Sequence, residues 1–454
     1  MSATVEKYLA RYAVPEARLP LRLPTAYEHV LVLPALGESV GFLEGVRSAL
    51  RGTDGSEAPG RRLLVLVVNS APETAEPLCA RNHELLEELT VRARAREFLQ
   101  REPPIQWLDL EGFDAVVVDR SSPGYQLPPR QGVGLARKLG ADLALGLHAR
   151  GQLRATGFGS TDADARLPVE YFSTGERALG TARAAIFPFS HGPSEDALVT
   201  RATAAYELSL RYYVLGLDHA GSSYAYHSLG STLYVGFEAY AQVRGFPKRR
   251  AGEDFYLLDK LAKLGAVRRL EAPCIQIDAR ISTRVPFGTG PGVQRLLMAA
   301  LGPEGLTLYA PRCFAVLGEV LASFSELAET RDVEGMRTGL AARLKEGTVP
   351  EGQVVLAHLD ALGMPEMLRE ALAQAKNSVQ LSRRLRVWFD ALRSLRLIHA
   401  LRDHCHPSLP WREALASAPF ACVDTASLES SVAALRQLEQ RLAPSIGALR
   451  GPAD

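Results

Sequence analysis

Two compact runs of apolar residues near the N-terminus predict buried strands. Residues 29–34 and 63–69 are almost uninterruptedly apolar, which is typical of strands in a parallel sheet that is covered on both faces. Between them, apolar residues recur at helical spacing from Val40 to Leu50. The order strand, helix, strand predicts an α/β fold with a mixed, mainly parallel sheet and helices on both faces.

The same alternation continues to about residue 290. Further extended segments are predicted at 107–110, 115–119, 142–145, 153–159, 184–189, 231–235 and 267–277. Further helices are predicted at 5–12, 78–100, 132–141 and 196–215 and from residues 171, 238 and 253 onward. The helix at 132–141 is expected to end at a glycine cap, Gly140.

From Gly292 onward the pattern changes to long amphipathic stretches without a convincing strand. We therefore expect an N-terminal arm at 1–28, which is punctuated by prolines, an α/β domain at 29–291 and an all-helical C-terminal region at 292–454. A chain of 454 residues is long enough for two or three domains.

Composition narrows the class of protein without naming a function. The 52 basic and 51 acidic residues leave a formal net charge of +1, so no global field recruits nucleic acid or an anionic membrane. Five widely spaced cysteines without a Cys-x-x-Cys pair argue against a disulfide framework or a structural zinc site. The abundance of Arg, Ala, Leu and Gly indicates a bacterial, GC-rich source. The absence of a signal peptide and of an apolar run of ~18 residues predicts no transmembrane segment and a cytoplasmic location.

The first candidate for chemistry is the triplet Asp162-Ala163-Asp164, which follows a short predicted strand. If that segment is extended, both aspartates point to the same side. Two carboxylates at a strand end suit Mg²⁺ or Mn²⁺, held jointly with substrate phosphates. The alternative is a polar turn, since these residue types also form turns.

The second candidate is the acid pair Glu253-Asp254, which opens a predicted helix after the turn at 244–247. A carboxylate can accept a proton from an attacking hydroxyl group, and the helix dipole is expected to keep Asp254 ionised. The alternative is simply acids in a first helical turn. The pair Gly132-x-Gly134 lacks the rest of a dinucleotide-binding fingerprint and does not follow a strong strand, so we exclude that function.

The order of these features resembles the family-two glycosyltransferases of the GT-A fold, over roughly residues 29–290. The resemblance is carried by the turn at 34–39, Asn69-Ser70, the aspartate triplet and Gly252-Glu253-Asp254. It implies a nucleotide-sugar-binding catalytic domain at 29–291. The resemblance implies nucleotide contacts at Pro34, Leu36, Glu38, Asn69 and Asp119, a phosphate contact at Arg137, and a loop with Arg284 and Thr289 that closes over the diphosphate.

The same resemblance implies that Asp162 and Asp164 bind Mn²⁺ or Mg²⁺ and contact the donor, and that Asp254, with Glu253 beside it, is the catalytic base. The family usually has aspartate at the position of Asn69. This departure leaves open whether the donor nucleotide contains uridine or guanosine. Many relatives have a histidine after the acid pair as a third metal ligand, but no histidine lies between Asp254 and His358. The alternatives are that Asp278 or water takes its place, or that the metal is loosely held. His191 and His227 are candidates for contacting the sugar or the acceptor.

These expectations favour a metal-dependent glycosyltransferase that moves a sugar from a UDP- or GDP-sugar to a hydroxyl acceptor, with inversion. One alternative is a nucleotidyltransferase, although residues 34–39 contain none of the basic residues that class usually shows after its first strand. Another is a non-catalytic scaffold of the same fold. The helical region is compatible with acceptor binding, a homodimer or contact with a membrane surface.

Overall fold

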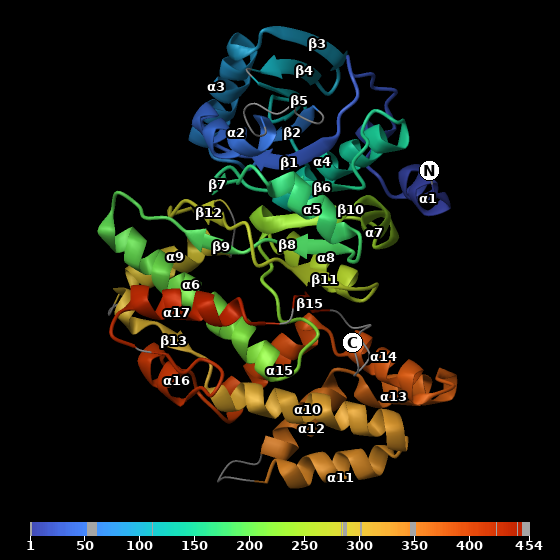
Figure 1. Ribbon diagram of the computed structural model, residues 1–454, viewed down its shortest axis with the longest axis vertical. Helices are drawn as coiled ribbons and strands as arrows, with labels where there is room; N and C mark the ends of the chain where they lie inside the picture. Colours follow the sequence, from blue (N-terminus) through green and yellow to red (C-terminus); the bar gives the residue numbers. More distant parts are fainter. Residues whose placement is uncertain are drawn as a thin grey trace. The chain divides into compact units, whose positions relative to one another are not determined.

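The chain forms two compact units, which Figure 1 shows by element. The computed structural model describes residues 2–51, 61–110, 112–282, 284, 288–299, 302–345, 351–423, 425–442 and 444–446. Unit 1 comprises Met1–Ser194, Ser228–Leu261 and Val267–Pro291, and unit 2 comprises Glu195–His227, Ala262–Ala266 and Gly292–Asp454. The division differs from the expected boundaries, because residues 1–28 group with unit 1 and residues 195–227 group with the C-terminal helices.

Unit 1 is built on one large sheet with the strand order β11-β8-β10-β6-β1-β2-β5-β4-β3. The strands are β1 His29–Ala35, β2 Arg62–Asn69, β3 Ala95–Gln100, β4 Ile105–Leu110, β5 Phe113–Arg120, β6 Gly157–Ser160, β8 Ala184–Ile186, β10 Leu233–Gly236 and β11 Val267–Arg269. Neighbours from β5 to β6 are parallel, whereas β10 and β4 run against their neighbours. The predicted α/β class with a mainly parallel sheet is confirmed.

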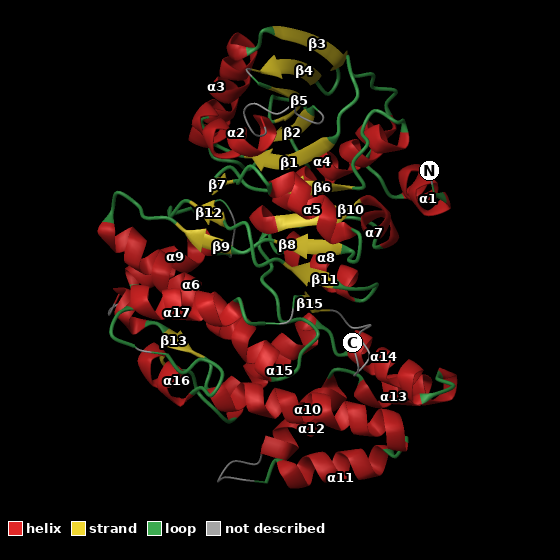
Figure 2. Cartoon of the chain, viewed as in Figure 1, coloured by secondary structure: helices red, strands yellow, loops and turns green. Residues whose placement is uncertain are grey.

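The helices of unit 1 cover both faces of the central strands, as the red and yellow elements of Figure 2 show. They are α1 Ala3–Arg11, η1 Pro15–Arg18, η2 Val40–Phe42, α2 Leu43–Arg51, α3 Glu76–Arg92, α4 Gly132–Ala149, α5 Tyr171–Leu179, η3 Gly230–Thr232, α7 Phe237–Gln242 and α8 Glu253–Ala262. Helix α4 packs on β1 and β2, and α2 and α3 also pack on β2. Residues 63–69 of β2 are therefore all buried.

A small second sheet in unit 1 has the order β7-β12-β9. Its strands are β7 Ala165–Arg166, β9 Phe189–His191 and β12 Ile275–Ile277. Strand β12 runs parallel to β9 and antiparallel to β7, and the backbone N–H of Asp278 donates to the carbonyl of Asp164. This sheet ties the segment that follows the aspartate triplet to the segment at 275–280.

Two local predictions in unit 1 are wrong. Residues 95–100 form the strand β3 rather than the end of a helix, and residues 142–145 continue α4 rather than forming a strand. Gly140 lies inside α4 and does not cap it. A Cβ atom at Gly140 would lie 2.5 Å from Cγ1 of Val32, so the missing side chain allows α4 to pack closely on β1.

The buried carboxylate of Asp142 explains why α4 continues and why the N-terminal arm is held in place. Asp142 has no exposed surface and accepts hydrogen bonds from the hydroxyl groups of Tyr8 (2.5 Å) and Tyr240 (2.8 Å) and from the N–H of Val14 (2.8 Å). The ammonium of Lys138 lies 3.1 Å away. A buried carboxylate needs such partners, and two of them come from residues 1–28.

Unit 2 is mainly helical, as predicted for the C-terminal region. Its helices are α6 Ala197–His219, α9 Thr289–Met298, η4 Gly302–Gly305, α10 Pro311–Thr330, α11 Val333–Arg343, α12 Glu351–Ala361, α13 Met364–Gln374, α14 Ser378–Trp388, α15 Ala391–His404, α16 Trp411–Ser417 and α17 Leu428–Glu439. The short strands β13 Thr307–Leu308, β14 Leu409–Pro410 and β15 Ser445–Ile446 interrupt them, so the region is not all-helical.

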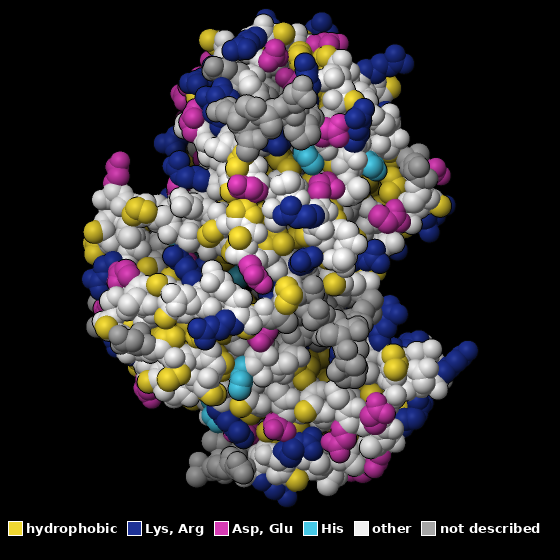
Figure 3. All heavy atoms as spheres, viewed as in Figure 1, with side chains coloured by type: hydrophobic (Ala, Val, Ile, Leu, Met, Phe, Trp, Pro, Cys, Tyr) yellow, Lys and Arg dark blue, Asp and Glu magenta, His cyan; other side chains and the backbone are white. Residues whose placement is uncertain are grey.

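Helix α6 packs against α17 through buried charges, which explains why it belongs to unit 2. Glu207 accepts from Arg211 (2.8 Å) and from Arg436 (2.7 Å), and Arg211 also donates to Glu439. None of the described helices combines the length and the apolar character that crossing a membrane requires. On the face drawn in Figure 3, basic side chains are interspersed with acidic ones, in keeping with the net charge of +1.

Candidate active site

Strand β6 delivers the aspartate triplet to the carboxyl end of the parallel strands. All four of its residues are buried between β1 and β10. A Cβ atom at Gly159 would lie 2.5 Å from the ring of Tyr171, so glycine is needed for this packing. The hydroxyl groups of Ser160 and Thr161 donate to the carbonyls of Gly230 (3.2 Å) and Ser231 (3.1 Å), which fixes the direction in which the chain leaves the sheet.

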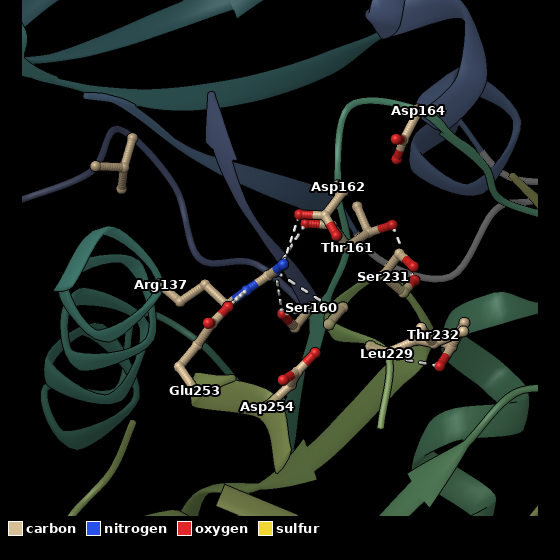
Figure 4. A network of polar contacts seen from close by, with 12 residues as sticks. Arg137, Ser160, Thr161, Asp162, Asp164, Leu229, Ser231, Thr232, Glu253 and Asp254 are labelled. Atoms are coloured by element: carbon tan, nitrogen blue, oxygen red, sulfur yellow. Dashed lines mark hydrogen bonds and ion pairs between the residues drawn. The ribbon is translucent and has the colours of Figure 1, made fainter. Parts of the chain in front are cut away.

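Arg137 occupies the centre of the site. Figure 4 shows its side chain reaching from α4 between Glu253 and Asp162. Its Nε donates to Glu253 Oε1 (2.8 Å) and its Nη2 to Asp162 Oδ1 (2.5 Å). Its Nη1 donates to the hydroxyl of Ser160 (3.0 Å) and to backbone carbonyls of residues 161 and 230. The guanidinium therefore joins the two acidic motifs that lie about ninety residues apart in the sequence.

Arg137 is 3% exposed. Burial by itself would lower the pKa of its guanidinium, but the charges of Asp162 and Glu253 raise the pKa above the ordinary value. The arginine stays charged, and its planar fork matches two carboxylates at once. A buried cation with two acidic partners fixes the relative positions of β6, α4 and α8.

Glu253 and Asp254 open α8 directly after Gly252, which has a φ of +74°. Glu253 is 3% exposed and is paired with Arg137, whereas Asp254 is half-buried and accepts from the N–H of Phe255 (2.7 Å). Burial, reinforced by the charge of Glu253, raises the pKa of Asp254 to about 7 against the opposing effect of Arg137. The expectation that the helix N-terminus would keep Asp254 fully ionised is therefore wrong near neutral pH.

A second group of charges surrounds Asp164. Nε of Arg280 donates to Asp164 Oδ2 (2.9 Å) and its Nη1 to Glu38 Oε2 (2.9 Å). Arg284 donates to the carbonyl of Leu36 (2.6 Å) and also to Glu38. Burial would raise the pKa of Glu38, but the hydrogen bonds and charges of Arg280 and Arg284 outweigh it and lower that pKa. For Asp164, burial prevails over Arg280 and raises the pKa.

A cavity of about 620 Å³ lies beside this group. Residues that line it include Glu38, Ser39, Arg81, Leu85, Arg280 and Arg284. Its volume lies in the range of small-molecule sites. Its wall is mainly polar, and Glu84 and Glu88 also line it, so acidic and basic side chains both face the cavity. The cavity is thus large enough for part of a nucleotide.

The aspartate triplet fits a divalent ion only as part of a shared coordination shell. Carboxylate oxygens suit Mg²⁺ and Mn²⁺, but Asp162 and Asp164 each already give one oxygen to an arginine. Within the described residues, no three or more His, Cys, Asp or Glu side chains gather in a way that could hold a metal ion. Substrate phosphates and water would have to supply the other ligands.

Three other residues singled out from the sequence have structural contacts. Pro34 is buried inside β1 opposite Val67. The amide of Asn69 donates to the carbonyl of Ala35 (2.9 Å), and the carboxylate of Asp119 accepts from the N–H groups of Ser121 and Ser122 (2.9 Å each). These contacts shape the ends of β1, β2 and β5.

The remaining candidates have other contacts or positions. Asp278 pairs with Arg166 (3.1 Å), and Thr289 is the first residue of α9. His191 ends β9, and His227 contacts Glu439 within unit 2 (2.8 Å).

Arg280 was not predicted from the sequence as a site residue, although it contacts both Glu38 and Asp164. No motif surrounds it, and its position depends on the pairing of β12 with β7 and β9. Asn82 was likewise not predicted. Its side chain accepts from the N–H of Gly37 (2.7 Å) and donates to the carbonyl of Asn69 (2.9 Å). A polar residue on the inner face of the helix at 76–92 was the available signal for Asn82.

Comparison with known proteins shows a distant structural similarity and no related sequence family. A scan against models of protein families found no match, and a search of curated proteins found none. Among solved structures, the chain is similar to the mannosyltransferase PcManGT from Pyrobaculum calidifontis in complex with GDP-Man and Mn²⁺. The similarity covers 86% of this chain and 92% of that chain, with a TM-score of 0.33 and 14% sequence identity. Values this low do not carry an activity, a donor or a metal over to this chain.

Proposed function

We propose that the chain is a glycosyltransferase that moves a sugar from a nucleotide-diphosphate sugar to a hydroxyl acceptor with inversion at the anomeric carbon. The observation that carries this proposal is the link that Arg137 makes between Asp162 and Glu253, with Asp254 beside them. This link brings Asp162, the proposed contact to the donor phosphates, and Asp254, the proposed catalytic base, to the same edge of the sheet. The pKa of Asp254, about 7, is well matched to general base catalysis near neutral pH.

In the proposed reaction, the Asp254 carboxylate accepts the proton of the acceptor hydroxyl group as its oxygen attacks the anomeric carbon. The bond from that carbon to the diphosphate breaks, and its electron pair leaves with the nucleoside diphosphate. Arg137 and Glu253 hold α8 against β6, so that the base keeps its place relative to the donor. Asp254 then releases the proton of the acceptor hydroxyl group to solvent.

We place the donor along Asp162, Asp164 and the cavity beside Glu38. Arg280 and Arg284 line that cavity and supply positive charge for the departing diphosphate. Mn²⁺ or Mg²⁺, held by Asp162 and Asp164 together with the donor phosphates, would supply Lewis-acid stabilisation of the same leaving group. The resemblance implies donor contacts at Leu36, Glu38 and Arg284. Glu38 and Arg284 line the cavity, and Arg284 donates to the carbonyl of Leu36.

The deciding experiment is a screen of UDP- and GDP-sugars with Mn²⁺, with release of the nucleoside diphosphate as the signal. Asp254→Asn and the double variant Asp162→Asn/Asp164→Asn should each lower the rate about 100-fold or more. Asp403→Asn is the matched control, because Asp403 is an exposed residue of unit 2 that pairs only with Arg402 among the described contacts.

The products separate the competing functions. Release of sugar 1-phosphate in place of nucleoside diphosphate would identify a nucleotidyltransferase. Turnover that is the same in wild type and both site variants would contradict the proposed site. No turnover and no thermal stabilisation by any nucleotide-sugar would favour a non-catalytic scaffold.

A further inference from the structure

The glycine pair Gly132-x-Gly134 has a packing role that points to a second feature near the site. The N–H of Gly134 donates to the carbonyl of Arg249 (2.9 Å). A Cβ atom at Gly134 would lie 2.5 Å from the carbonyl oxygen of Pro247 and 2.7 Å from the nitrogen of Arg249. At Gly132, which has a φ of +40°, it would lie 3.0 Å from Cα of Arg250. The two glycines thus seat the turn at 247–250 on the first turn of α4.

This turn is held next to the candidate active site from both sides. The helix on which it rests carries Arg137, and the chain that leaves it enters α8 at Glu253 and Asp254. Asp254 follows Arg250 by four positions, so their Cα atoms can lie at most about 14 Å apart. The turn is therefore close to Asp254 along the chain.

The turn is strongly basic. Lys248, Arg249 and Arg250 are consecutive and exposed, and Arg130, in the turn before α4, is also exposed with a φ of +65°. We call these four residues the basic rim. Within the described part of the chain, the rim forms one ion pair, from Arg250 to Glu73 at 3.6 Å, in which the side chains are 56% and 41% exposed.

The other cations of the rim are available to a ligand. Arg249 lies over the ring of Tyr256, 4.0 Å from its centroid, which orders the guanidinium without neutralising it. Among the described residues, Arg130 and Lys248 have no acidic partner. Burial lowers the pKa of the neighbouring Lys138, and the charges of Lys248 and Lys260 lower it further, against Asp142. The charge of Lys248 therefore acts on a buried residue of α4.

We propose that the basic rim binds a phosphate group of the acceptor, so that the acceptor is a phosphorylated hydroxyl compound. This inference rests on the proposed function, in which an acceptor hydroxyl group approaches Asp254. Arginine and lysine side chains suit phosphate oxygens, which accept several charge-assisted hydrogen bonds. The donor diphosphate has its own cations at the Asp164 end of the site, Arg280 and Arg284. The formal net charge of +1 does not indicate a protein that binds nucleic acid.

Binding can be measured on the full chain without donor, so that the result does not depend on turnover. Isothermal titration with sn-glycerol 3-phosphate, with glycerol as the uncharged comparison, tests a soluble acceptor. Sedimentation with phosphatidylglycerol vesicles, against phosphatidylcholine vesicles, tests a lipid that carries the same group. The test variant is Arg130→Gln/Lys248→Gln, which leaves the contacts of Arg249 and Arg250 in place. The control is Arg383→Gln/Arg384→Gln, an exposed pair on α14 that has no ion pair among the described residues.

We expect the test variant to bind one of the two phosphate probes about tenfold more weakly than wild type, while the control stays within about twofold. The probe that responds tells whether the phosphate belongs to a soluble compound or to a lipid. Equal binding by wild type and test variant, or no binding of either probe by wild type, would overturn the inference. Sugar transfer to a neutral acceptor without phosphate binding would leave the proposed function intact and reject the rim. Phosphate binding that depends on the rim, without turnover of any nucleotide-sugar, would support the rim and reject the proposed function.

Discussion

Asp254→Asn should stabilise the protein at alkaline pH while it lowers the catalytic rate about 100-fold or more. The substitution keeps the shape of the side chain and removes its charge. Burial and Glu253 raise the pKa of Asp254 from 3.8 in an unfolded chain to about 7 in the folded protein. The folded state therefore binds this proton more tightly than the unfolded state. The stability that the protonated side chain gives is fully present below pH 3.8 and is lost as the pH rises through about 7.

The size of the effect follows from the two pKa values. Each pH unit between them costs about 1.4 kcal/mol, so ionisation of Asp254 costs on the order of 4 kcal/mol above pH 8. The free-energy cost of ionising Asp254 in the folded protein therefore increases by about 2 kcal/mol between pH 5.5 and pH 8.5. For a domain of this size, about 2 kcal/mol corresponds to a shift in Tm of roughly 4–8 °C.

Differential scanning calorimetry of wild type and Asp254→Asn at these two pH values, in a metal chelator and without donor, measures the difference. The Tm advantage of the variant should be larger at pH 8.5 than at pH 5.5. Asp403→Asn serves as the control, because Arg402 lowers the pKa of Asp403. The Tm difference between this variant and wild type should therefore not increase from pH 5.5 to pH 8.5. An advantage of the same size at both pH values would mean that Asp254 titrates at its ordinary pKa and would refute the reasoning.

Three further predictions test the site and the packing around it. Arg137→Met should lower the free energy of unfolding by about 3–5 kcal/mol in urea denaturation, because it leaves the acids that it pairs without their buried cation; a loss below about 1 kcal/mol would show that those acids find other partners. Removal of divalent ions with EDTA should abolish sugar transfer, and Mn²⁺ or Mg²⁺ should restore it; full activity in EDTA would mean that Arg280 and Arg284 stabilise the leaving group alone. Gly140→Ala should cost about 1–3 kcal/mol because its Cβ would meet Val32 at 2.5 Å, whereas Gly339→Ala, whose nearest neighbour is the flexible end of Arg343 at 3.4 Å, should stabilise α11 by roughly 0.4–1 kcal/mol; equal effects of the two alanines would contradict the close packing of α4 on β1.

Local pattern was enough to predict the α/β class and the sheet core. The runs at 29–34 and 63–69 are apolar on both faces, and such segments can only be buried by helices on each side of a sheet. The same pattern located the aspartate triplet after a strand and Glu253-Asp254 at the start of a helix. It failed at 95–100 and 142–145, where tertiary contacts override local preference: β3 pairs with β4, and α4 continues so that Asp142 meets Tyr8 and Tyr240.

Hydrophobic periodicity is a property of neighbouring residues, so it indicates which segments are buried and where acidic residues follow them. Folding then places Arg137 between Asp162 and Glu253, brings Arg280 to both Glu38 and Asp164, and packs α6 with the C-terminal helices. It also decided the pKa of Asp254, which depends on burial and on charges brought together by folding. Those quantities belong to residues far apart along the chain, and no local pattern records their distances.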